Sequence, residues 1–131
     1  MNVLDASAAV EWLLRLPLAS AVDDRLADAD RTLHAPHLLD DEVAQVVRRF
    51  EARDAITPER GAQALTDLAD LDVNRYPHAP LLPAVWQWRA NLTAYDAVYV
   101  ALAAALDATL LTLDARLASA PLHRVTVDLV A

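Results

Sequence analysis

The sequence contains no cysteine and no lysine, and it has one glycine among its 131 residues. The absence of cysteine excludes a disulfide framework, a thiolate zinc site and nucleophilic thiol chemistry. The one glycine, Gly61, lies inside an expected helix, so the chain cannot form a glycine-rich loop that cradles phosphates. Nucleotide cofactors of the dinucleotide and P-loop types are therefore not expected.

Two further features are missing from the sequence: a basic leader ahead of an apolar segment, and an apolar run long enough to span a membrane. We therefore expect a cytoplasmic protein without a membrane partner. Hydrophobic residues make up 56% of the chain, which is enough for one core at this length. We predict a single domain over residues 1–131.

Positive charge is also scarce, because 19 acidic residues stand against 11 basic ones, all of them arginine, and the formal net charge is −8. This balance argues against nucleic-acid binding, which normally uses a basic surface. Local charge decides where a phosphate binds, however, and two divalent ions in an acidic site would add +4 to −8 and leave −4.

Apolar segments of strand and helix type alternate along the chain, without hairpin signals between them. Strands are expected at 2–5, 32–35, 72–75 and 109–113 and around 125–127, and helices at 7–14, 20–29, 38–54, 57–69, 84–91 and 93–106, with a turn or short helix at 114–118. Ser7 is the expected cap of the first helix, and Pro36 is expected to break the second strand. Thr57 before Pro58 marks the start of the helix at 57–69, in which Leu65 and Leu68 are expected to face the core. The fold class is α/β, a three-layer α/β/α domain with a mainly parallel sheet of about five strands.

Four acidic residues stand at the ends of these elements. Asp5 and Asp114 close strands, whereas Glu42 and Asp96 enter helices. In a parallel sheet these positions share one edge, where ligands bind. Carboxylates about 4 Å apart would repel by about 4 kcal/mol, a cost that hard divalent cations remove, so we expect Mg²⁺ or Mn²⁺.

Each of these acids also has a structural alternative. Thr93 to Asp96 resembles a capping box, Asp114 can cap the short helix after it, and Glu42 can complement a helix dipole. Asp5 can pair with the Ser7 amide. The sequence leaves these alternatives open.

Four motifs resemble the PIN-domain ribonucleases of the VapC toxin type. They are Val3-Leu4-Asp5-Ala6-Ser7, the segment from Pro36 to Glu42 with Val43-Ala44 after it, Tyr95-Asp96-Ala97, and Leu111-Thr112-Leu113-Asp114. The resemblance implies that Asp5, Glu42, Asp96 and Asp114 are catalytic and ligate one or two Mg²⁺ or Mn²⁺ ions, with Ser7 and Thr112 as supporting hydrogen-bonding residues. The chain departs from the family pattern at Asp41 and at 91–93, neither of which alters the four acids.

The same resemblance implies an Mg²⁺- or Mn²⁺-dependent endoribonuclease, the toxin of a type II toxin–antitoxin system. It would hydrolyse RNA phosphodiester bonds with metal-activated water, leaving a 5′-phosphate and a 3′-hydroxyl. A cognate VapB-type antitoxin would inhibit it, and a homodimer is expected.

Other functions stay open at this point. The chain can be a PIN-domain nuclease of RNA processing that is no toxin, or a catalytically silent PIN-like interaction module. A phospho-accepting receiver would need a lysine, and a haloacid-dehalogenase-type phosphatase would need an aspartate where Ser7 stands.

Several further residues are weaker candidates. Arg116 is a candidate substrate contact or a surface ion pair. Arg48, Arg49 and Arg53 either bind phosphate or solvate their helix, and solvation is favoured. Asp40 and Asp41 fit a helix-dipole role. The four histidines show no metal-ligand spacing and are expected mostly at the surface, with His37 nearest to a predicted ligand. Of Trp86 and Trp88, one is expected in the core and the other at the surface.

Overall fold

The computed structural model describes residues 1–122 and 124–131. Within these residues, five strands form one sheet in the order β3-β2-β1-β4-β5, and each neighbouring pair is parallel. The strands are β1 (Asn2–Leu4), β2 (Leu33–Pro36), β3 (Val73–Tyr76), β4 (Thr109–Thr112) and β5 (Val127–Leu129). The predicted three-layer α/β/α class with a parallel sheet is confirmed.

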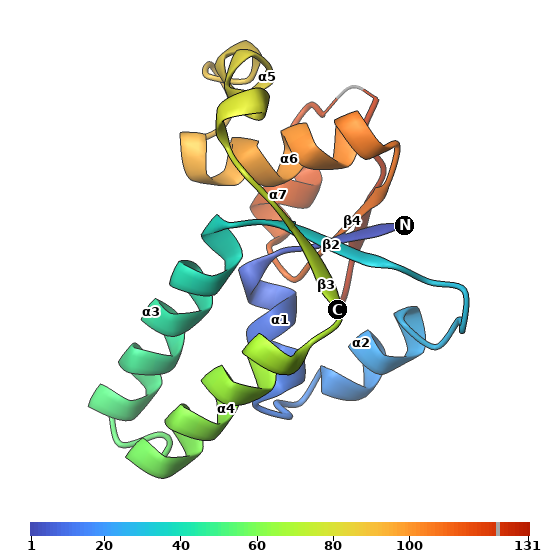
Figure 1. Ribbon diagram of the computed structural model, residues 1–131. Coiled ribbons are helices and arrows are strands. Elements are labelled where there is room, and N and C mark those ends of the chain that lie inside the picture. The colour runs from blue at the N-terminus through green and yellow to red at the C-terminus, as the bar shows by residue number, and fades with distance from the viewer. Residues whose placement is uncertain (123) are drawn as a thin grey trace.

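Helices cover both faces of this sheet (Figure 1). In the described residues they are α1 (Ala6–Leu13), α2 (Ala19–Arg25), α3 (Leu38–Ala52), α4 (Pro58–Asp70), α5 (Leu82–Gln87), α6 (Ala94–Leu106) and α7 (Ala115–Ser119), with a 3₁₀ turn, η1, at Ala79–Leu81. Helix α6, overlaid by α5, packs on one face, and α1 to α4 lie on the other. None of the described helices is both long and apolar enough to cross a membrane.

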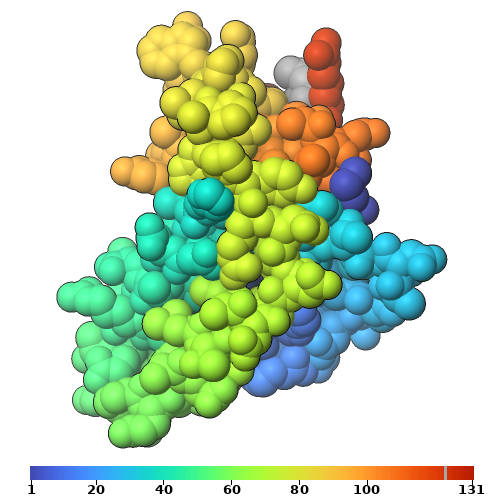
Figure 2. Space-filling view, viewed as in Figure 1, coloured from blue at the N-terminus to red at the C-terminus, as the bar shows by residue number. Residues whose placement is uncertain are grey.

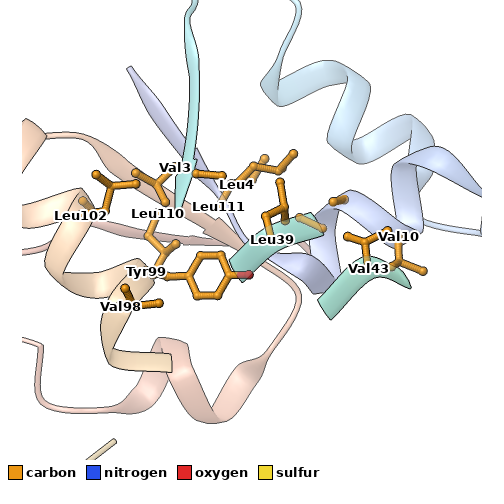
Figure 3. Packing of buried hydrophobic residues seen from close by; sticks show 14 of the residues in the cluster. Val3, Leu4, Val10, Leu39, Val43, Val98, Tyr99, Leu102, Leu110 and Leu111 are labelled. Carbon is orange, nitrogen blue, oxygen red and sulfur yellow. The ribbon is translucent and has the colours of Figure 1, made fainter. Parts of the chain in front are cut away.

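The core lies between the sheet and its helices (Figure 3). Strand side chains such as Leu4, Leu110 and Leu111 are fully buried because helices cover both sides of the sheet. In α6 all residues from Ala97 to Ala103 are buried. This explains why the helix reads as apolar on every side, as expected for a helix packed between a sheet and another element.

The strand register aligns the ends of β1 and β4. Leu4 pairs with Leu111, so Asp5, the residue after β1, lies beside Thr112, the last residue of β4. Because all five strands run in the same direction, their carboxyl ends and the helix starts that follow lie at one edge of the sheet. The four predicted acids come from this edge.

Several local predictions were wrong. The cap of α1 is Asp5 instead of Ser7, because β1 ends one residue earlier than expected and the Asp5 carboxylate accepts from the Ala8 amide. The helix expected at 20–29 already ends at Arg25, and the last strand begins at Val127. The second strand does end at Pro36, whose missing N–H is tolerated at the strand end. Leu65 was expected in the core with Leu68 but is 37% exposed.

The face formed by α3, α4 and β3 is seen in Figure 2, where α4 and β3 are yellow-green. Arg75 of β3 makes an ion pair of 2.9 Å with Asp40 of α3 and donates to the Leu68 carbonyl of α4, also at 2.9 Å. The Arg75 guanidinium thus connects β3 with α3 and α4. Asp40 therefore has a structural partner, whereas Asp41 is exposed.

Candidate active site

Asp5 is the most constrained of the four predicted acids. It is buried, and its Oδ1 accepts hydrogen bonds from the Ser7 hydroxyl (2.6 Å) and the Ala8 amide (3.0 Å), while Oδ2 accepts from the Thr112 hydroxyl. Burial raises the pKa of Asp5 above its ordinary value, although these donors act in the opposite direction and the nearby Asp114 raises it slightly further. The carboxylate is therefore fixed in one orientation.

The hydroxyls of Ser7 and Thr112 connect the ends of β1 and β4. Ser7 Oγ accepts from the Leu113 amide at 2.9 Å, and Thr112 Oγ1 accepts from the Asp114 amide at 3.0 Å. The two hydroxyl oxygens lie 3.3 Å apart. Both residues thus orient Asp5 and at the same time fix the backbone that leads into Asp114.

Glu42 reaches the same edge from the second turn of α3, beyond the first-turn acids Asp40 and Asp41. Its Oε1 accepts a hydrogen bond of 2.6 Å from the hydroxyl of Tyr99 in α6. Burial raises the pKa of Glu42; the Tyr99 hydrogen bond lowers it, and the charges of Asp96 and Asp5 raise it again. Glu42 therefore lies close enough to Asp96 and Asp5 to feel their charges.

Asp96 and Asp114 occupy helix starts, as the structural alternatives anticipated. Thr93 is the cap of α6, and its hydroxyl accepts from the Asp96 amide at 3.2 Å. Asp114 is the cap of α7 and accepts from the amides of Arg116 (2.9 Å) and Leu117 (3.4 Å). Capping and a role in the site are therefore compatible in Asp114, because one carboxylate can accept several hydrogen bonds.

The four acids line one pocket. Its walls are Asp5, Ala6, Ser7, Glu42, Asp96, Tyr99 and Asp114. Asp96 and Asp114 also line the pocket beside it, which includes Arg116. Arg116 is largely exposed and lies 3.4 Å from Asp114, so the surface ion pair predicted as one alternative is present. We call the first pocket the carboxylate pocket.

Oxygen is the donor atom of all four acids, which is the chemistry that Mg²⁺ and Mn²⁺ prefer. The donor atoms of the four residues therefore fit such an ion. Among the residues that the structure describes, however, no three carboxylates or imidazoles are close enough together to hold one metal ion. The carboxylate pocket thus has the ligand types without a closed ligand cage.

The histidines of the described residues do not line the carboxylate pocket. His34 is buried and hydrogen-bonded to Thr32 and Tyr76, which contradicts a surface position for it. The ring of His78 accepts from the Leu38 amide at the start of α3, and His37 is exposed. The expected surface position of His123 lies outside the described residues.

The remaining candidates separate into core and surface. Arg48, Arg49 and Arg53 are exposed on α3, which suits the solvated interpretation. Trp86 is 64% exposed, whereas Trp88 packs against the core, as predicted for this pair.

Sequence reasoning missed Tyr99, whose hydroxyl lies in the carboxylate pocket. A weak signal was available, because Tyr99 follows Asp96 by three residues and therefore lies near it on the same helix surface. Its contact with Glu42, however, joins two helices whose relative position only the fold defines.

Comparisons with known proteins agree with this fold and identify the family of the chain. The PIN domain matches residues 3–121. The chain is 49% identical over 120 residues to ribonuclease VapC1 of Mycobacterium tuberculosis, covering 91% of this chain and 90% of that protein. It is 40% identical to ribonuclease VapC12 of the same organism over 131 residues, the whole of both chains.

Solved structures give the same result for the fold. VapC20 of Mycobacterium tuberculosis, a toxin that cleaves the sarcin-ricin loop, superposes with a TM-score of 0.70 at 12% identity and covers 96% of this chain and 99% of its own. VapBC2 of Rickettsia felis, bound to a DNA fragment from its promoter, gives a TM-score of 0.70 at 14% identity, with 97% and 96% covered.

The domain has a parallel sheet between helices, with acidic residues at the carboxyl ends of its strands. Together with the family match over 3–121, this defines the class of protein: the chain belongs to the PIN-domain family. Within that class, identities of 40% and 49% over nearly the whole length place it among the VapC ribonucleases. The resemblance stated from the four motifs is confirmed.

Proposed function

We propose that this protein is an Mg²⁺- or Mn²⁺-dependent endoribonuclease and the toxin of a type II toxin–antitoxin system. One observation carries the proposal: in a chain of the VapC group, four carboxylates from four different elements line the same pocket. The relatives are named as ribonucleases, and RNA is accordingly the proposed substrate.

Asp5, Glu42, Asp96 and Asp114 are the residues that would hold the metal. A bound Mg²⁺ or Mn²⁺ would supply charge that offsets the scissile phosphate and would lower the pKa of a water molecule. Burial, and to a smaller extent the neighbouring carboxylates, raises the pKa of Asp5 and Glu42, and a divalent charge in the pocket would favour their ionised forms. The separated carboxylates would have to rotate toward one another to share an ion.

Other residues of the site would orient a metal ligand and bind the substrate. Ser7 and Thr112 hold the Asp5 carboxylate, so this ligand loses little side-chain entropy when the site is filled. Arg116 lines the pocket beside the carboxylate pocket, and its exposed guanidinium can bind an RNA phosphate in place of its long contact with Asp114. Hydrolysis by water would leave a 5′-phosphate and a 3′-hydroxyl.

A cognate VapB-type antitoxin is the proposed protein partner. Membership of the VapC group supports it, and the related fold of VapBC2 from Rickettsia felis was solved as a complex of toxin and antitoxin on DNA. A homodimer is proposed on the same family basis. In the complex, an antitoxin arginine placed among the carboxylates would compete with the metal.

The proposal is tested by inducing the wild-type chain or Asp96→Asn in bacteria and mapping RNA 5′-monophosphate ends. New ends at a few sites together with growth arrest, both lost in Asp96→Asn, are expected. Asp72→Asn is the matched control, because it removes the same charge from an exposed position before β3. Identical end profiles for wild type and Asp96→Asn, with both proteins soluble and abundant, would favour the catalytically silent module.

A further inference from the structure

Tyr99 joins the carboxylate pocket to the core. It lies in the middle of α6, is 2% exposed, and its ring packs among apolar side chains while its oxygen points toward α3 (Figure 3). There its hydroxyl donates to Glu42 Oε1 at 2.6 Å. The packed ring fixes the position of the hydroxyl, and the hydroxyl in turn fixes the carboxylate.

Glu42 depends on this one contact. In the described part of the chain, no other side chain donates a hydrogen bond to its carboxylate, whereas Asp5 receives three donors. A glutamate side chain has three rotatable bonds, and fixing them costs conformational entropy. Without Tyr99, Glu42 would be free to leave the pocket for solvent, away from the charges of Asp96 and Asp5 that repel it.

The protonation state of Tyr99 suits this task. A phenol is normally protonated at neutral pH, so the Tyr99 hydroxyl is available as a donor to the Glu42 carboxylate, 2.6 Å away. A hydrogen bond from a neutral hydroxyl to a carboxylate is stronger than one between neutral groups. Oε1 is thereby occupied, and Oε2 has no side-chain partner in the described residues.

We propose that Tyr99 is a positioning residue that holds Glu42 by Oε1 and leaves Oε2 free to ligate a divalent cation. This inference rests on the proposed function, because it gives Glu42 a role as a metal ligand. Removing a residue that donates a hydrogen bond to a metal ligand typically lowers metal affinity by about 10- to 100-fold. Tyr99 acts through Glu42 alone and does not touch the metal.

The test compares Mn²⁺ binding by calorimetry in the purified wild type and in Tyr99→Phe, which keeps the buried ring and removes only the hydroxyl. We expect Mn²⁺ affinity to fall by about 10- to 100-fold. Two matched variants isolate the effect. Tyr95→Phe changes an exposed tyrosine of the same helix, and Tyr76→Phe removes a hydroxyl that is bonded to His34 instead of a carboxylate. Both should bind Mn²⁺ as the wild type does.

A double-mutant cycle shows whether Tyr99 acts through Glu42. In a Glu42→Gln background, adding Tyr99→Phe should weaken Mn²⁺ binding by less than about threefold, because the residue to be positioned is already lost. Equal losses in both backgrounds would overturn the positioning role, as would wild-type affinity in Tyr99→Phe. If the wild type bound no Mn²⁺, the metal-dependent function would fall together with this inference. Normal wild-type binding with an unaffected Tyr99→Phe would overturn this inference alone.

Discussion

The hydroxyl of Thr112 at the end of β4 donates a hydrogen bond to Oδ2 of Asp5, 107 residues earlier in the chain. The same hydroxyl accepts from the Asp114 amide, so it connects two of the four acids that line the carboxylate pocket. Thr112 is fully buried, and solvent cannot replace it. The fold and the site therefore share this side chain.

Thr112→Val keeps the shape of the side chain and removes both hydrogen bonds. We expect the free energy of unfolding to fall by about 1–3 kcal/mol, because a buried carboxylate oxygen and a backbone amide lose their partners. Urea denaturation measures this change. Thr66→Val is the control, since Thr66 is exposed on α4 and bonds only within its own helix. Equal stability losses in the two variants would contradict the expectation.

The pH dependence of stability should reveal the buried carboxylates. Burial raises the pKa of both Asp5 and Glu42, so each binds its proton more tightly in the folded than in the unfolded chain. Such a group contributes stability that is complete below its unfolded pKa and is lost as pH rises through its folded pKa. Through these two groups, the metal-free protein should lose stability as pH rises from the ordinary pKa of an unfolded carboxyl group through the raised pKa values of the folded chain.

The contribution of Asp5 to this slope can be isolated with Asp5→Asn. Asparagine keeps an acceptor for the Ala8 amide and cannot titrate, so the loss of stability with rising pH should be smaller in the variant than in the metal-free wild type. Its amide nitrogen cannot accept the hydrogen bond from Thr112, which lowers the free energy of unfolding by a similar amount at every pH. Asp72→Asn removes an exposed charge and should leave the slope unchanged. A wild-type slope in Asp5→Asn would contradict this explanation.

Divalent ions should stabilise the folded protein. An ion that binds only the folded state at about 100 times its dissociation constant adds about 2.7 kcal/mol to the free energy of unfolding. We expect Mn²⁺ to raise the melting temperature of the wild type and a chelator to reverse the change. Asp5→Asn combined with Asp96→Asn should abolish the response. A response of wild-type size in this double variant would place the ion outside the carboxylate pocket.

Arg116→Gln should affect RNA binding more than stability. The side chain is 88% exposed and its ion pair with Asp114 spans 3.4 Å, so its loss should change the free energy of unfolding by less than about 1 kcal/mol. If Arg116 contacts a phosphate, KM for RNA should rise. The slope of the logarithm of the binding constant against the logarithm of salt concentration should also become smaller by about one, the value for one phosphate contact. Arg25→Gln removes a pair of the same length, with Asp128, outside both pockets. Equal KM changes in the two variants would argue against a specific contact.

The sequence was sufficient to predict elements whose signals are local. The caps Thr57 and Thr93 and the strand at 109–112 were located by residue type and pattern alone. Ser7 was assigned the wrong role because a serine and an aspartate two residues apart are both good helix caps, and only the end of β1 decides between them.

Features that join distant segments could not be predicted in the same way. The exposure of Leu65 depends on how α3, α4 and β3 pack, and the bond from Tyr99 to Glu42 depends on the relative position of α3 and α6. The acids themselves were found because parallel strands impose a common edge. The separation of the four carboxylates within the pocket could not be predicted, because side-chain rotamers leave no pattern in the sequence.

The position of β1 between β2 and β4 also governs when the site can exist during synthesis of the chain. Asp5 leaves the ribosome well before its partner Thr112 and the neighbouring Asp114, which follow more than a hundred residues later in the chain. A nascent chain that lacks β4 cannot assemble the carboxylate pocket, whatever else has folded. The proposed ribonuclease activity would therefore begin only after β4 has been synthesised and has paired with β1.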